Sequence, residues 1–82
     1  MNPLTEVRLP QWGMDMREGT LTQWLLEVGD WVDEDDEMAE VETSKAVEMV
    51  IAPCTGKVTE IKVQAGATVE IGTVLCLIEE DP

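Results

Sequence analysis

The chain repeats itself with a period of 37 residues, and this periodicity limits the folds that are open to it. Gly19 is followed by Gly56 and Gly29 by Gly66 at this interval. Six pairs of apolar residues obey the same shift: Leu21 and Val58, Trp24 and Ile61, Leu26 and Val63, Val32 and Val69, Met38 and Leu75, Val41 and Ile78. We expect two copies of one strand–turn–strand–turn–strand unit, stacked as two sheets about a pseudo-twofold axis around one shared core.

The spacing inside each copy predicts short β-strands, because no segment keeps a helical period over ten residues. In both copies the apolar positions step by three and then by two, which indicates the same β-bulge twice. Asp35 occupies the position of Gly72, and Asp is among the few residues that tolerate positive φ. The expected strands cover residues 6–9, 20–28, 31–32, the two arms of a hairpin that ends at residue 51, and 57–63, 68–70 and 73–78. We expect a lead-in at residues 1–5, one domain at 6–79 and the start of a linker or tail at 80–82.

The hairpin has a polar turn with one lysine at its tip. Its outgoing arm alternates Val47, Met49 and Ile51 with Glu48 and Val50, which is typical of a half-buried strand. The turn residues Thr43, Ser44, Lys45 and Ala46 carry no large apolar group, so we expect the turn to project into solvent with Lys45 furthest out. The 37-residue shift moves Lys45 onto position 82, which predicts that the hairpin tip and the chain termini lie at opposite ends of the sandwich.

Lys45 is a better tether than catalyst. A lysine becomes nucleophilic when desolvation or a nearby cation favours its neutral form, whereas the neighbouring charges here are the carboxylates of Glu42 and Glu48. Another enzyme could still acylate this amine if it recognised the turn. The alternative is a lysine that only keeps an exposed hairpin soluble.

Composition excludes several functional classes. The formal net charge of −13 disfavours binding to nucleic acid or to an anionic membrane surface, and no apolar run is long enough for a membrane span. The chain has no histidine, which excludes a Cys–His or Ser–His–Asp nucleophile and argues against a metal site. Cys54 and Cys76 do not form a Cys-x-x-Cys pair, and we expect two free thiols in the cytoplasm, with a disulfide left open.

At this point the motifs resemble a known family. Glu42-Thr43-Ser44-Lys45-Ala46, with Met38-Ala39-Glu40-Val41 before it and Ala52-Pro53-x-x-Gly56 after it, resembles the lipoyl domain of the acyltransferase component of 2-oxo acid dehydrogenase complexes. The segment Leu9-Pro10-x-Trp12-Gly13-Met14-x-Met16-x-Glu18-Gly19 is similar to the opening of that family, and the resemblance extends from about Val7 to Ile78. It differs at Ser44, where lipoyl domains usually have Asp.

The resemblance implies a non-catalytic carrier. The fold would be a flattened β-barrel or sandwich of two four-stranded antiparallel sheets, with lipoate joined by an amide bond to Nζ of Lys45. A lipoate ligase or lipoyl-transfer enzyme would attach the group after recognising the turn residues Thr43, Ser44 and Ala46. The lipoyl group would accept an acyl group from a thiamine-dependent decarboxylase, deliver it to coenzyme A at an acyltransferase domain, and be reoxidised by dihydrolipoamide dehydrogenase. The oxo acid would be of the pyruvate, branched-chain or acetoin type.

Further residues have expected roles. In the family, the loop after the first strand helps the decarboxylase to recognise its own domain, so Trp12, Met14 and Met16 are candidates for that contact or for edge packing. Glu42 and Glu48 are candidates for charge steering of basic partners. We expect Trp24 in the core and Trp31 in packing, and we expect Lys57 and Lys62 to stay unmodified. Two alternatives stay open: a biotinyl carrier domain, whose lysine typically has methionine on both sides, and a β-sandwich interaction module that carries no cofactor.

Overall fold

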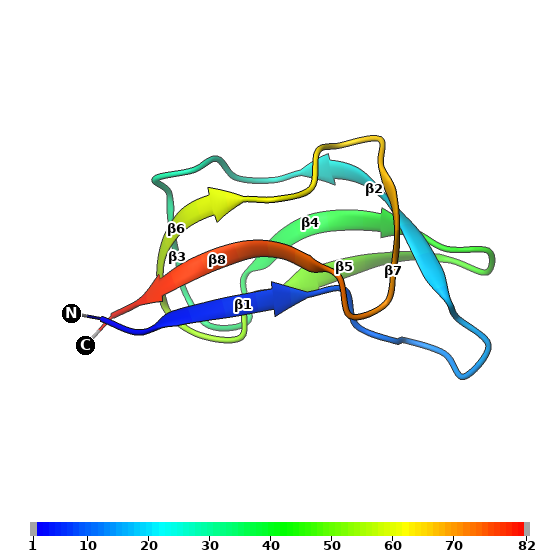
Figure 1. Cartoon of the computed structure of the whole chain (residues 1–82), viewed down its shortest axis with the longest axis horizontal. Coiled ribbons are helices and arrows are strands. Elements are labelled where there is room, and N and C mark those ends of the chain that lie inside the picture. Colours follow the sequence, from blue (N-terminus) through cyan, green and yellow to red (C-terminus); the bar gives the residue numbers. More distant parts are fainter. Residues whose placement is uncertain (1, 82) are drawn as a thin grey trace.

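The computed structural model describes residues 2–81 as eight β-strands in two four-stranded antiparallel sheets (Figure 1). The strands are β1 (Leu4–Arg8), β2 (Glu18–Trp24), β3 (Trp31–Val32), β4 (Glu37–Glu42), β5 (Val47–Ile51), β6 (Gly56–Ile61), β7 (Thr68–Glu70) and β8 (Val74–Glu80). One sheet has the order β1-β8-β6-β3 and the other has the order β5-β4-β2-β7. The predicted all-β sandwich of two four-stranded sheets is therefore confirmed.

The 37-residue repeat appears in the structure as internal symmetry. The shift carries β2, β3 and β4 onto β6, β7 and β8, and β1 and β5 occupy equivalent edge positions. The predicted bulge occurs in both copies, between Leu21 and Gln23 in one sheet and between Val58 and Glu60 in the other. Positive φ occurs at both predicted turn positions, with 75° at Asp35 and 85° at Gly72.

The core lies between the two sheets and consists of apolar side chains. It contains Val7, Leu9, Leu21, Val32, Met38, Ala39, Val41, Val50, Ala52, Val58, Val63, Leu75, Cys76 and Ile78. Trp24, which was expected in the core, is only partly buried and packs against this cluster, and its Nε1 donates a 2.8 Å hydrogen bond to the carbonyl oxygen of Val63. The expected packing role of Trp31 is wrong, because 55% of this residue is exposed and its Nε1 donates instead to a carboxylate oxygen of Asp33.

Several strand limits differ from the expected ones, because backbone pairing and not the apolar pattern decides where each strand begins and ends. β1 begins at Leu4, inside the expected lead-in, since Leu4 pairs with Glu79 of β8. β8 continues to Glu80, which pairs with Gly56 of β6. The strands expected to reach residues 28 and 63 end at Trp24 and Ile61. Residues 1 and 82 of the expected lead-in and linker lie outside the described residues, and the linker itself stays a prediction.

The molecule is elongated, with extents of 38, 22 and 17 Å, and its two ends are different. The first residues of β1 and the last residues of β8 lie together at one end, whereas the turn between β4 and β5 projects at the other (Figure 1). The loop between β1 and β2 lies at the same end as this turn. The counterpart of Lys45 under the repeat, position 82, is not among the described residues.

Candidate functional site

The side chain of Thr43 holds the turn between β4 and β5. Its hydroxyl donates a 3.0 Å hydrogen bond to the carbonyl oxygen of Ala46 and accepts bonds from the amides of Lys45 (3.3 Å) and Ala46 (3.2 Å). The backbone amide of Thr43 donates a further 2.8 Å bond to the same carbonyl of Ala46. These bonds close a tight turn with only Ser44 and Lys45 at its tip.

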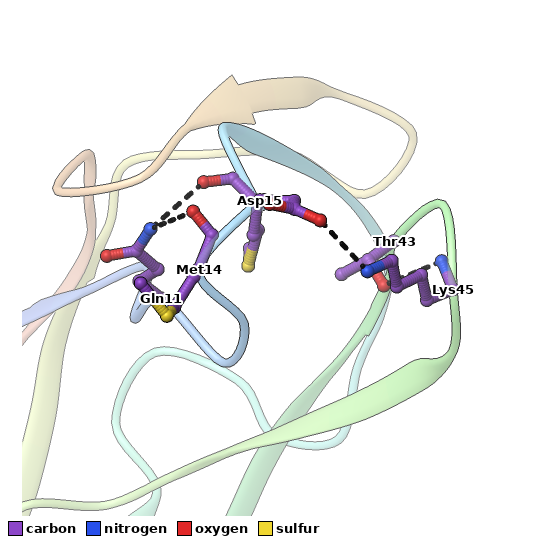
Figure 2. Close-up of polar contacts among 6 residues, drawn as sticks. Gln11, Met14, Asp15, Thr43 and Lys45 are labelled. Carbon is purple, nitrogen blue, oxygen red and sulfur yellow. Dashed lines mark hydrogen bonds and ion pairs between the residues drawn. The ribbon is translucent and has the colours of Figure 1, made fainter.

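Lys45 extends from this tip, and 76% of its side chain is exposed. Its Nζ lies 3.2 Å from Oδ2 of Asp15, a residue of the loop between β1 and β2 (Figure 2). Because the Asp15 side chain is 82% exposed, this ion pair contributes at most about 1 kcal/mol. It orients the amine without restraining it strongly, so Nζ is accessible to an enzyme that would acylate it.

The loop that supplies Asp15 is ordered by its own hydrogen bonds. Nε2 of Gln11 donates to the carbonyl oxygens of Met14 (3.2 Å) and Met16 (3.3 Å), as Figure 2 shows for Met14. The amide of Met16 donates to the carbonyl of Gly13, which closes a turn. Met14 at the outer side of this turn is 97% exposed, whereas Trp12 and Met16 pack partly against the core.

A hollow of about 610 Å³ separates the loop from the hairpin. Trp12, Asp15 and Met16 line it from the loop, and Thr43, Ser44, Lys45 and Ala46 line it from the turn. Glu42 and Glu48 contribute carboxylates to the same hollow. The structure thus brings together every residue that the sequence suggested for this site except Met14, which points to solvent. The roles of these residues stay predictions.

Asp15 is the residue of this site that the sequence analysis missed. It is one of 18 acidic residues in the chain and stands 30 positions away from Lys45. The pattern around it contains no signal that would single it out. Its partnership with Lys45 follows only from the tertiary approach of the loop to the hairpin.

The other two lysines of the chain are placed differently. Lys57 lies in β6, which pairs on both sides with β3 and β8. Lys62 follows the end of β6 and forms a 3.2 Å ion pair with Glu60. Neither side chain stands at the tip of a hairpin.

Metal ligands, cysteines and membrane-spanning helices were also considered in the described residues. Within residues 2–81 no group of three or more His, Cys, Asp or Glu side chains is arranged to hold a metal ion. Cys54 and Cys76 are both free thiols, and burial raises the pKa of the Cys76 thiol to about 12. The described part of the chain has no helix that is long and apolar enough to cross a membrane.

Comparisons with known proteins agree with the family resemblance seen in the sequence. Residues 5–78 match the biotin/lipoyl family model, described as biotin-requiring enzyme. The dihydrolipoyllysine-residue acetyltransferase component of the pyruvate dehydrogenase complex is 40% identical over 72 residues in Corynebacterium glutamicum and 42% identical over 67 residues in Bacillus subtilis. These alignments cover 88% and 82% of this chain but only 11% and 15% of the two relatives, so the chain spans a small part of their length.

A solved structure agrees with the sequence relatives. The solution structure of the lipoyl domain of the 2-oxoglutarate dehydrogenase complex from Azotobacter vinelandii superposes with a TM-score of 0.73 at 30% identity. The match covers 93% of this chain and 98% of that domain. It therefore extends over nearly the whole fold, both sheets included. The chain belongs to the biotin/lipoyl attachment family, in which it is a lipoyl domain.

Proposed function

We propose that this domain is a carrier that holds lipoate in amide linkage on Nζ of Lys45 and performs no catalysis of its own. The observation that carries the proposal is the position of Lys45, an exposed amine at the tip of a hydrogen-bonded turn beside a hollow. The structural match supports the same cofactor, because the solved structure that it matches is itself a lipoyl domain. The names of the relatives favour lipoate over biotin.

The residues around Lys45 fit an attached acyl group. Lipoate, when bound, supplies a dithiolane that accepts an acyl group and reducing equivalents. Thr43 fixes the turn so that the Lys45 side chain leaves the domain in one direction. Amide formation would convert the Nζ ammonium to a neutral group and end its charge attraction to Asp15. The hollow, lined by both apolar and polar side chains, leaves space beside the tether.

The partners follow from the same proposal. Trp12, Met14 and Met16 would contact the thiamine-dependent decarboxylase, and the 97% exposure of Met14 supports such a contact. Glu42 and Glu48 would steer basic partner surfaces toward the site. An acyltransferase domain and dihydrolipoamide dehydrogenase would complete the cycle in the cytoplasm. We favour a complex of the pyruvate type, because the names of the relatives support it.

Intact-mass measurement tests the proposal. The protein is incubated with lipoate, ATP and a lipoate ligase, and a Lys45→Ala variant is treated in parallel. We expect a single lipoyl adduct on the wild type and none on the variant. Labelling of Lys45 by a biotin ligase alone would establish the biotinyl alternative, and no labelling by either enzyme would leave only the cofactor-free interaction module.

A further inference from the structure

The two sheets have equivalent edge strands, β1 and β5, whose outward faces differ. Each edge strand pairs with its neighbour in the same register. Leu4 of β1 lies opposite Glu79 of β8, and Val47 of β5 lies opposite Glu42 of β4, which is the residue that the 37-residue shift carries onto Glu79. The inward positions also agree, because Val7 is 4% exposed and Val50 is 2% exposed. The outward positions of β5 can therefore be compared directly with those of β1.

On β1 the outward positions hold Leu4, Glu6 and Arg8. Glu6 and Arg8 form an ion pair of 2.6 Å between Oε1 and Nη2. Charges of this kind on an edge strand protect it from pairing with other chains. The β1 edge therefore has the ordinary protection of a solvent-exposed sheet edge.

On β5 the three equivalent positions hold Val47, Met49 and Ile51. Val47 is 56% exposed, Ile51 is 51% exposed and Met49 between them is half-buried, so this edge presents apolar side chains to solvent. The symmetry of the fold does not require this row, because β1 fulfils the same structural position with a charged pair. A reason outside the packing of the domain itself is needed for it.

The position of the row indicates what that reason is. The row begins two residues after Lys45 and extends for about 13 Å along the strand. Directly opposite it in β4 lie three carboxylates, with Glu42 facing Val47, Glu40 facing Met49 and Glu37 facing Ile51. No lysine or arginine occurs between residues 18 and 44 to neutralise them. The surface is an apolar strip beside an acidic one, and it leads directly to the amine.

We propose that the outward face of β5 and β4 is the docking surface for the enzyme that attaches the lipoyl group to Lys45. The complementary surface on that enzyme would be an apolar strip flanked by lysine or arginine side chains. This inference rests on the proposed carrier function. The attaching enzyme is the partner that fits this surface, because it meets a domain without a cofactor and has only the protein surface to recognise. The small side chains of the turn itself, Ser44 and Ala46, offer little contact area.

The test compares matched variants on the two edges. Ile51→Glu places a charge in the row six residues from Lys45, and the double variant Met49→Glu/Ile51→Arg copies the charged pair of β1 onto β5. Leu4→Glu is the control, because Leu4 is 57% exposed at the position equivalent to Val47 on the other edge. Circular dichroism and thermal melting confirm that each variant is folded. The rate of lipoyl attachment by a lipoate ligase with lipoate and ATP is then followed by intact mass.

We expect kcat/KM for attachment to fall about tenfold in both β5 variants, because one buried apolar anchor typically carries this share of an interface. The fall should lie in KM, with kcat unchanged, and Leu4→Glu should match the wild type. Rates within twofold of the wild type for both β5 variants would overturn the inference while leaving the carrier function intact. It would also be overturned by a wild-type dimer in sedimentation that Ile51→Glu dissociates, since a second copy would then cover the row. A wild type that gains no adduct would refute the carrier function and this inference with it.

Discussion

Replacement of Thr43 by valine tests how strongly the turn positions Lys45. Valine keeps the β-branched shape of threonine but removes the hydroxyl, which makes one 3.0 Å and two longer hydrogen bonds within the turn. A net hydrogen bond contributes about 0.5–1.5 kcal/mol, and the turn is accessible to water that can replace part of the loss. We therefore expect Thr43→Val to lower the free energy of unfolding of the turn by about 1–2 kcal/mol, which is a factor of about 5–30 in its opening equilibrium.

Amide hydrogen exchange followed by NMR measures this opening directly. The amides of Lys45 and Ala46 should exchange about 5–30 times faster in Thr43→Val, whereas core amides such as that of Val58 should change less. Thr43→Ser, which retains the hydroxyl, should restore most of the protection. The rate of lipoyl attachment should fall in the valine variant because fewer molecules present the amine correctly. Unchanged exchange at Lys45 and Ala46 would refute the view that the Thr43 side chain fixes the turn.

Three further predictions concern the fold. A Cβ added at Gly56 would clash with the backbone oxygen of Glu79, so Gly56→Ala should reduce the free energy of unfolding in urea by more than about 3 kcal/mol. A loss below about 1 kcal/mol would contradict the close approach of β6 and β8. At Asp35, where φ is 75°, the urea midpoint should rise slightly for glycine and fall for alanine; an alanine variant as stable as the glycine variant would argue against the left-handed backbone. Because Cys76 is buried and its pKa is raised to about 12, iodoacetamide at pH 8 should modify only Cys54 in the folded protein and both thiols after unfolding; labelling of Cys76 at the rate of Cys54 would indicate that the core opens.

The architecture was predictable because the 37-residue repeat includes positions that accept only a few residue types. Gly29 and Gly66 both adopt positive φ, near 100°, where a side chain is strained. Leu21 and Val58 are both buried at the start of a bulge, which fixes the same change of face in each sheet. Positions that must be glycine or apolar therefore recur at the same interval in both copies, and the interval can be recognised in the sequence. Two equivalent halves in turn predict two equivalent sheets.

The faces and ends of some strands were less predictable. In β5 the alternation of apolar residues correctly predicted a half-buried strand but did not show which face is buried: Val50 is buried, whereas Val47 and Ile51 are exposed and Met49 is half-buried. Backbone pairing with β4 decides this face, since Val50 lies opposite Ala39. The exposure of Trp31 has a similar cause, because β3 has only two residues and its other residue, Val32, occupies the core.

The candidate site was predictable where it is local. A lysine in a turn of small polar residues between two strands is visible in the sequence, and the structure places it at the projecting tip. The partner of that lysine was not visible, because the Asp15 contact joins residues 30 positions apart through a loop without regular structure. Contacts of this kind depend on the path of the loop, in which Gln11 bonds the carbonyl oxygens of Met14 and Met16 while Trp12 and Met16 pack against the core.

Peptide mapping by tandem mass spectrometry tests the central claim most directly. The protein is produced together with a lipoate ligase in cells supplied with lipoate, and each lysine is examined for the lipoyl group. We predict complete modification of Lys45, with Lys57 and Lys62 unmodified, because only Lys45 stands at the tip of the turn between β4 and β5. Lipoate on Lys57 or Lys62, or a Lys45 that stays unmodified, would contradict the account.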